Sequence, residues 1–203
     1  MTQTHNETIE QKIAKYHEFF SIEHNFSINV LPLESSKVTT LEQFLADMPT
    51  PFKMASDMKS IDQSALRPLQ ALSGVAGQLV EFLNHQSSKI DLLIGYILSQ
   101  QDDEEHRYQG IEFGGGGLLF TADKAFGLAQ LLEMKIFLLN KNCAVYCYGE
   151  VIDIQQEQES YLHKVIFHFI REDDREILVR NSLHEQSKQL QILAQQRNED
   201  NKL

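Results

Sequence analysis

The sequence predicts an α+β protein in which a long heptad-bearing helix precedes a small antiparallel β-barrel with a C-terminal helix. Two observations predict this fold. Apolar residues recur every three or four positions between residues 69 and 97, as they do along one side of a helix. From about residue 102 the pattern changes to short β-branched and aromatic runs with only a few residues between them, which is typical of successive strands.

These patterns divide the 203 residues into three parts. Residues 1–58 form an N-terminal region of helix and loop, residues 59–101 form the long helix, and residues 102–203 form the barrel with its C-terminal helix. A chain of this length can bury a sizeable core.

The N-terminal region begins with apolar residues at spacings of four, three and four, which predict an amphipathic helix: Ile9, Ile13, Tyr16 and Phe20. A loosely alternating stretch from Phe26 to Leu31 predicts a short strand. Several prolines punctuate the residues between this strand and the long helix, among them Pro49 and Pro51. We interpret that stretch as loop with a short helix at Leu41–Asp47.

The long helix carries one residue at each step of a four-three spacing: Leu72, Ala76, Leu79, Leu83, Gln86, Ile90, Leu93 and Ile97. This spacing is that of a coiled-coil seam, and a polar seam residue such as Gln86 costs stability but fixes register and strand number. We therefore predict that these eight residues form an oligomer interface, with a tetramer favoured. The helix is expected to begin near Pro68, since proline is tolerated in a first turn. An ordinary amphipathic helix packed on its own domain is the alternative.

Strands are predicted in the third part at residues 107–113, 118–122, 131–139, 144–154 and 161–170. Short links between successive strands imply antiparallel pairing, and closing the sheet into a barrel removes its exposed edges. A helix is expected from Glu172 to about Gln196. Its heptad-spaced residues predict a second, weaker heptad surface: Val179, Leu183, Gln186, Leu190 and Leu193.

Composition narrows the class of partner and compartment. The chain carries 29 acidic against 18 basic residues, a net charge of −11, which disfavours nucleic acid or an anionic membrane surface as partner. Two cysteines are too few for a disulfide scaffold, and the first 30 residues lack the basic-then-apolar pattern of a secretory signal. No apolar stretch approaches the roughly 20 residues of a membrane span. We expect a cytoplasmic protein with no membrane insertion.

The run Gly114–Gly117 invites comparison with a phosphate-binding loop, but no Lys-Ser or Lys-Thr follows it and it joins two strands. We predict instead a hairpin or bulge whose glycines adopt positive φ. The acidic run Asp102–Glu105 is interpreted as a solvated loop between the long helix and the barrel.

The remaining candidates for chemistry are Cys143, Cys147, His163 and His168. The two cysteines share one face of a predicted strand and are expected to be buried thiols, while the two histidines lie on opposite faces of theirs. No metal-ligand spacing and no nucleophile motif is present, so we predict no metal, no cofactor and no enzyme. An enzyme that uses Cys143 or Cys147 with His163 is the outlying alternative.

Four segments in order resemble the PilZ domain, a bacterial β-barrel with a C-terminal helix that in its standard form binds cyclic di-GMP: IEFGGGGLLF, GLAQLLEMKIFLL, VYCYGEVIDI and YLHKVIFHFIREDDREILVR. The resemblance covers Arg107 to Ser187. It places the family's Asp/Asn-x-Ser-x-x-Gly motif at Glu112–Gly117, where Glu112 and Gly114 depart from the motif and only Gly117 matches it. The family's Arg-x-x-x-Arg motif has no counterpart upstream.

The segment LNHQSSKIDLLIGYILSQ is similar to an atypical, tetramer-forming PilZ subfamily that lacks the nucleotide motifs. The resemblance implies a non-enzymatic oligomeric adaptor in cyclic di-GMP-linked or type IV pilus-linked signalling, acting on an unknown signalling or pilus-assembly protein. An Arg-x-x-x-Arg does occur at Arg171–Arg175, but it follows the last strand and encloses three carboxylates. The alternative is a cyclic di-GMP receptor with a rearranged site built from Arg107, Arg171 or Arg175.

Overall fold

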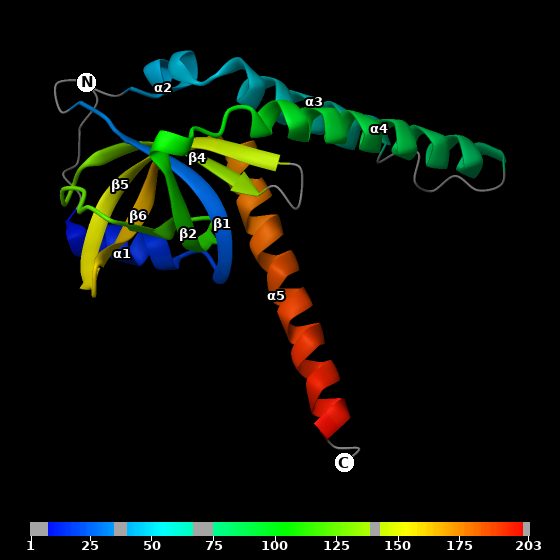
Figure 1. Cartoon of the computed structure of the whole chain (residues 1–203). Coiled ribbons are helices and arrows are strands. Elements are labelled where there is room, and N and C mark those ends of the chain that lie inside the picture. Colours follow the sequence, from blue (N-terminus) through cyan, green and yellow to red (C-terminus); the bar gives the residue numbers. More distant parts are fainter. Residues whose placement is uncertain (1–7, 35–39, 67–74, 139–142, 201–203) are drawn as a thin grey trace.

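The computed structural model describes residues 8–34, 40–66, 75–138 and 143–200. Its helices are α1 (Ile9–His17), α2 (Leu41–Asp47), α3 (Thr50–Leu66), α4 (Val75–Ser99), the short 3₁₀ helix η2 (Glu104–His106) and α5 (Glu172–Asp200). Its strands are β1 (Ser21–Pro32), β2 (Arg107–Gly114), β3 (Gly117–Ala122), β4 (Leu131–Leu138), β5 (Cys143–Glu157) and β6 (Ser160–Phe169). Figure 1 shows a barrel from which two helical projections extend. Among the described helices, none is long and apolar enough to cross a membrane.

The six strands close into a barrel in the order β1-β2-β3-β6-β5-β4, with every neighbouring pair antiparallel. The predicted fold, a long helix followed by a small antiparallel barrel and a C-terminal helix, is confirmed. Residues 1–58 were predicted to form a region separate from the barrel. They contain β1, however, which lies between β2 and β4 and closes the barrel. A lone strand early in a chain carries no local sign of such distant partners.

The barrel interior is filled by inward-facing residues from all six strands and by Leu178 of α5. Cys143 and Cys147 both belong to this core, as their shared face predicted, and neither forms a disulfide. The alternate residues Ala144, Tyr146 and Tyr148 point outward from β5 into a second apolar cluster. The period of two along the strand thus builds one core inside the barrel and another outside it.

The second cluster joins the barrel to the helical part of the chain. Phe44 of α2 and Phe52 of α3 pack on Tyr146 with ring centroids 5.7 and 5.8 Å apart, and Ile94 and Leu98 of α4 complete the cluster. The Tyr148 hydroxyl donates a hydrogen bond to Asp47 at 3.2 Å. The end of α4 nearest the barrel is therefore fixed by aromatic packing on β4 and β5.

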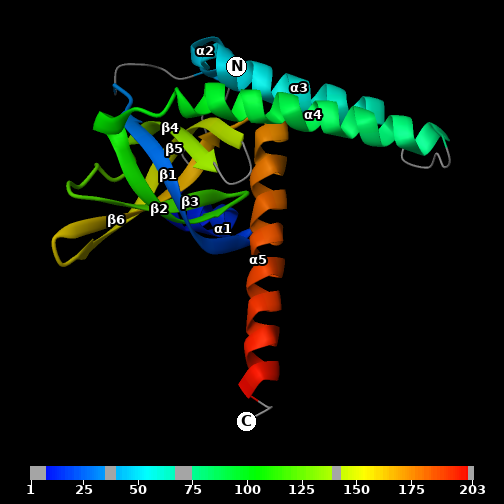
Figure 2. The same cartoon turned by 45° about the vertical axis from the view of Figure 1, so that its right-hand side comes forward.

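The stretch after Pro49 is helix rather than the predicted loop. Pro51 lies in the first turn of α3, where its missing N–H is not needed, and no proline or glycine interrupts the sequence from Phe52 to Leu66. Residues 59–101 consequently contain the end of α3 and the whole of α4 instead of one long helix. Figures 1 and 2 show α3 and α4 side by side, projecting from the barrel as one arm. The predicted start near Pro68 lies outside the described residues.

The remaining α-helices, α1 and α5, pack on other parts of the barrel. Thr8 caps α1 by accepting a hydrogen bond from the Gln11 N–H, and Tyr16 of α1 is buried against Ile152 and Ile166. The first half of α5 packs on β1 and β2, with Leu178 and Ser182 buried, and its second half runs past the barrel (Figure 2). The predicted C-terminal helix is confirmed and extends to Asp200.

Candidate functional site

The predicted seam of α4 lies on the open side of the arm. The seam leucines and isoleucines are between 37% and 64% exposed in the single chain: Leu79, Leu83, Ile90, Leu93 and Ile97. Gln86 is half-buried. Ala76 lies within α4 but its side chain is outside the described residues, as is Leu72 altogether. We call the exposed members, together with Gln86, the α4 stripe.

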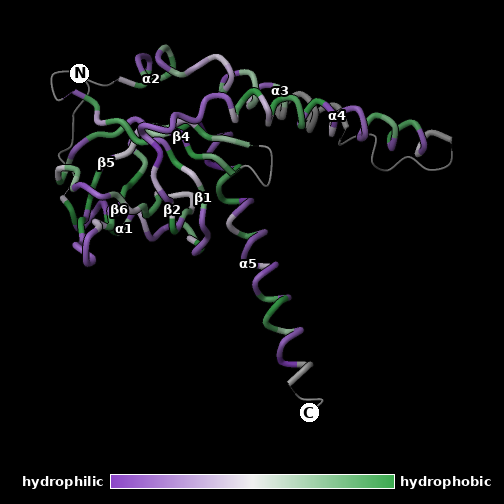
Figure 3. The backbone as a smooth tube through the Cα atoms, viewed as in Figure 1, coloured by the Kyte–Doolittle hydropathy of each residue, from purple (hydrophilic) through white to green (hydrophobic). Residues whose placement is uncertain are grey.

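Near the barrel, another side of α4 is already occupied by its own chain. Ile94 and Leu98 are 8% and 1% exposed and pack against the cluster beneath α2 and α3. Phe82 and Tyr96 lie beside the α4 stripe by helical spacing, Leu92 lies further around the helix, and all three are more than half exposed. In Figure 3 the backbone of the arm alternates between hydrophobic and hydrophilic stretches. An apolar surface of this extent on a projecting helix is typical of a protein interface.

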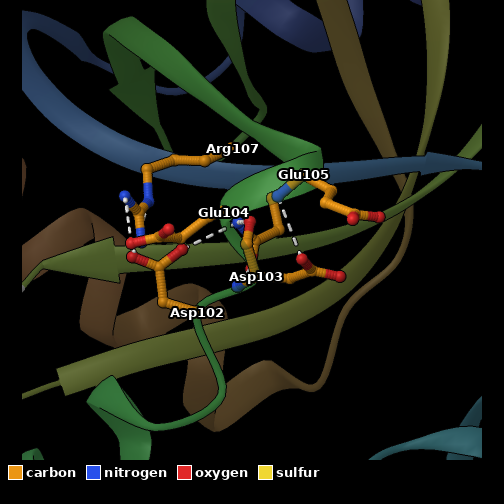
Figure 4. A network of polar contacts seen from close by, with 6 residues as sticks. Asp102, Asp103, Glu104, Glu105 and Arg107 are labelled. Atoms are coloured by element: carbon orange, nitrogen blue, oxygen red, sulfur yellow. Dashed lines mark hydrogen bonds and ion pairs between the residues drawn. The ribbon is translucent and has the colours of Figure 1, made fainter.

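The junction between α4 and β2 is held by a polar network that sequence analysis did not predict. Asn29 of β1 is fully buried, and its amide nitrogen donates to Asp102 Oδ1 at 2.8 Å and to the Asp103 carbonyl at 2.9 Å. Its amide oxygen accepts from the Asp103 N–H at 2.8 Å. Arg107 donates to Asp102 Oδ2 at 2.9 Å, and Figure 4 shows these acidic residues gathered around the start of β2.

The interpretation of Asp102–Glu105 as a merely solvated loop is therefore wrong for Asp102, whereas the side chain of Asp103 is exposed and only its backbone is held by Asn29. The side chain of Asp102 is 12% exposed because Asn29 and Arg107 surround it, whereas Glu104 remains open to solvent. A single asparagine within the apolar strand was the available signal. Its effect is to tie the base of the arm to the strand that closes the barrel.

Replacing Asn29 by alanine should lower the free energy of unfolding by about 2–3 kcal/mol, because two backbone groups of Asp103 and one carboxylate oxygen lose their partner. Urea denaturation monitored by circular dichroism measures this change. Ser27→Ala on the same strand is the control, since the buried Ser27 hydroxyl has no hydrogen-bond partner among the described residues. Equal losses in the two variants would contradict the role given to Asn29.

The four glycines between β2 and β3 are buried, and none of them has a positive φ, so the predicted reason for them is wrong. Close approach explains them instead. A Cβ on Gly116 would lie 2.6 Å from the Tyr16 carbonyl oxygen, and one on Gly117 would lie 2.8 Å from the Tyr16 ring and overlap the Val165 carbonyl oxygen. The turn is therefore covered by α1 and by β6.

Tyr16 is the residue through which α1 contacts the strands on either side of the glycine turn. Its hydroxyl donates a hydrogen bond to Glu112 Oε1 at 3.0 Å, and its ring lies 5.3 Å from Lys164 Nζ. Burial, followed by the nearby Glu112 carboxylate, raises the pKa of Tyr16 well above its ordinary value. Lys12 of α1 pairs with Glu150 at 2.5 Å. The hydrogen bond from Tyr16 therefore gives the Glu112 carboxylate a partner within the chain.

Comparison with known proteins identifies the barrel. Residues 84–183 match the PilZ domain family, a range that includes the end of α4, strands β2 to β6 and the first part of α5. The chain carries a PilZ domain. The strand β1, which closes the barrel of this PilZ domain, precedes the matched residues.

Two solved structures resemble this PilZ protein. A pathogenic protein from Xanthomonas campestris, described as a tetrameric PilZ domain self-assembled via an unusual helical bundle, matches with a TM-score of 0.53 and 14% identity over 88% of this chain and 96% of that one. The Bacillus subtilis inhibitor of motility, MotI/DgrA, matches with a TM-score of 0.38 and 16% identity over 40% of this chain and 42% of that one. At these identities the first likeness is one of fold. Among curated proteins, none matches the chain.

The three arginines considered for a rearranged nucleotide site lie in separate places on this PilZ domain, each with acidic or carbonyl partners. Arg171 donates to Asp174 at 2.7 Å and to the Phe52 carbonyl at 3.0 Å, which ties α5 to α3. Arg175 donates to the Gly115 carbonyl and lies 5.3 Å from the Phe19 ring. Arg107 pairs with Asp102 at the base of the arm.

The thiols of the PilZ barrel are poorly placed for nucleophilic chemistry. Burial raises the pKa of the Cys147 thiol well above its ordinary value, which keeps it protonated, and Cys143 is 3% exposed. His163 is buried elsewhere in the core, where its ring stacks on Phe120 and its Nε2 accepts from the Phe126 N–H at 3.0 Å. His168 lies on the outward face of the same strand and is exposed, as the alternation predicted.

His163 makes the stability of the barrel depend on pH. Burial lowers its pKa, and the protonated ring could not accept from the Phe126 N–H. Below about pH 6.5 this histidine therefore binds a proton in the unfolded chain, whereas the native ring binds it only at a lower pH. As the pH is lowered through this range, the free energy of unfolding should fall by up to about 1.4 kcal/mol per pH unit. Urea denaturation between pH 7.5 and 5.5 measures this slope.

The variant His163→Phe should flatten the slope in that range, because the buried group that gains a proton on unfolding is gone. The exposed His184→Ala is its control and should leave the slope unchanged. A wild-type slope in His163→Phe would assign the dependence to other groups.

Proposed function

We propose that this chain is a non-enzymatic PilZ-domain adaptor that assembles as a tetramer through the α4 stripe. The single observation that carries the proposal is the row of exposed leucines and isoleucines along a helix that packs on its own chain through different residues, Ile94 and Leu98. The description of the Xanthomonas structure as a helical-bundle tetramer supports it. The full interface is the predicted seam, with Leu72 and Ala76 at its start and Gln86 setting the register.

The apolar surface is large enough for a stable assembly. Eight large apolar side chains of α4 are between 37% and 66% exposed. Burying the surface that each still exposes would stabilise the assembly by roughly 1 kcal/mol, or on the order of 8 kcal/mol per chain. The loss of translational and rotational freedom opposes this gain. Side chains beside the seam, such as Phe82 and Tyr96, widen the apolar surface beyond what one neighbouring helix can cover, which favours four chains over two.

The adaptor acts in the bacterial cytoplasm, in cyclic di-GMP-linked or type IV pilus-linked signalling, on a signalling or pilus-assembly protein. This role rests on the family resemblance. Its test is a pull-down from the native bacterium with the wild-type chain and with a chain whose assembly is broken. A partner that binds only the assembled form supports an oligomeric adaptor, and a metabolic enzyme activity that co-purifies with the pure chain would contradict it.

The adaptor does not itself bind cyclic di-GMP. Glu112 is hydrogen-bonded to Tyr16, the glycine turn is covered by α1, and each of the three candidate arginines has partners within the chain. A dianionic ligand near Glu112 and the acidic junction would also meet like charge. Titration calorimetry with the nucleotide at low salt is expected to give no heat of binding. Micromolar affinity would favour the alternative, a receptor with a rearranged site.

A further inference from the structure

Within the part of the chain that the structure describes, the second half of α5 has little tertiary support. Its last hydrogen bond to the barrel runs from the Gln189 side chain to the Glu23 carbonyl at 3.0 Å, and every residue from 187 to 197 is exposed. Figures 1 and 2 both show this half extending past the barrel with no other described element beside it. Most helices in proteins owe their stability to packing of an apolar face, so this half lacks its usual support.

The exposed half nevertheless carries an apolar face. Leu183, Leu190 and Leu193 are 48%, 59% and 50% exposed and, with Gln186, follow the heptad spacing. We call these four residues the α5 stripe. No acidic residue occurs from 186 to 197 in a chain whose net charge is −11. Two identical α5 stripes can therefore meet without the repulsion that acidic surfaces of this chain would cause.

We propose that the α5 stripe packs against the α5 stripe of a second copy of this chain within the assembled oligomer. The proposal rests on the proposed assembly through α4, which supplies the second copy. It adds a second contact between the chains, made by the C-terminal helix rather than by the arm.

The small area of the α5 stripe favours a second copy of this chain over a partner that binds from solution. The three leucines expose on the order of 300 Å² in all, well below the roughly 800 Å² per partner of a stable complex. A partner from solution would bind too weakly to remain on such a surface. A chain already held at the α4 stripe faces only an intramolecular step, because tethering raises its effective concentration to the millimolar range.

The α5 contact is tested by cross-linking the full-length chain through an introduced cysteine. In Leu190→Cys the new thiol lies in the α5 stripe, and in the matched control His184→Cys it lies on an exposed position away from it. The native Cys143 and Cys147 are buried and give little background. A short bismaleimide, which alkylates one thiol at each end, joins two chains only when their thiols are close. Denaturing gel electrophoresis then separates joined from single chains.

We expect at least about fivefold more joined chains for Leu190→Cys than for His184→Cys, since tethered stripes meet at high effective concentration. Adding Leu79→Glu and Leu83→Glu should reduce Leu190→Cys to the control level. Equal cross-linking at the two positions, in chains that light scattering finds oligomeric, would overturn the α5 contact alone. A monomeric wild-type chain would overturn the assembly through α4 and the α5 contact together.

Discussion

The double variant Leu79→Glu/Leu83→Glu is expected to be monomeric, with a mass near the 23.3 kDa of one chain. Both side chains lie in the α4 stripe and are 59% and 37% exposed within the single chain. In the proposed assembly each would place a carboxylate in an apolar seam, where an unpaired charge costs several kcal/mol. The loss is repeated in every chain of the oligomer. Gel filtration with light scattering measures the mass.

Asn84→Glu/Ser88→Glu is the matched control. It introduces the same two charges four residues apart on α4, at exposed positions outside the stripe, and should remain oligomeric. Circular dichroism should find native helix content in both double variants, since all four substituted side chains are exposed in the single chain. Dissociation of the control as well would indicate a general effect of charge on the arm rather than a specific seam.

Gly117→Ala is expected to lower the free energy of unfolding by about 3 kcal/mol or more, since overpacking against rigid backbone has no cheap relaxation. The added Cβ would overlap the Val165 carbonyl oxygen of β6 and lie 2.8 Å from the buried Tyr16 ring. Gly117 is also the one residue that matches the family's nucleotide motif. Its packing against Val165 and Tyr16 accounts for a glycine here without any ligand.

Gly127→Ala controls for the loss of glycine itself. A Cβ at Gly127 has the Gln130 side-chain oxygen at 3.4 Å as its nearest neighbour and no backbone atom in the way. Chemical denaturation of both variants should therefore separate them by at least about 2 kcal/mol. Similar stabilities would mean that α1 and β6 can move away from the turn, and the close packing inferred at Gly117 would be wrong.

The strands β2 to β6 and the helices α2 and α5 could be predicted from sequence because each depends on local periodicity and nearby turn residues. The short strand predicted from Phe26 to Leu31 is part of β1, but its place in the barrel could not be predicted, because β1 pairs with segments about 80 and 105 residues later in the chain and its sequence carries no mark of those partners. Pro51 indicates loop when it is considered alone, although the same residue suits the first turn of α3.

The candidate site divides in the same way. The α4 stripe follows from helical spacing, so the sequence predicted which residues share a face, and the structure adds that this face is open in the single chain. The glycine turn and the Asn29 network depend on contacts between α1, β1 and distant strands. Such contacts are set by tertiary packing, which local spacing does not encode.

The central claim is that the α4 stripe is buried between chains, and the mass of the wild-type protein in solution tests it most directly. Light scattering after gel filtration is expected to give four times the 23.3 kDa chain mass. A single-chain mass at micromolar concentration would contradict the account, because the exposed leucines and isoleucines of α4 would then have no partner of their own kind.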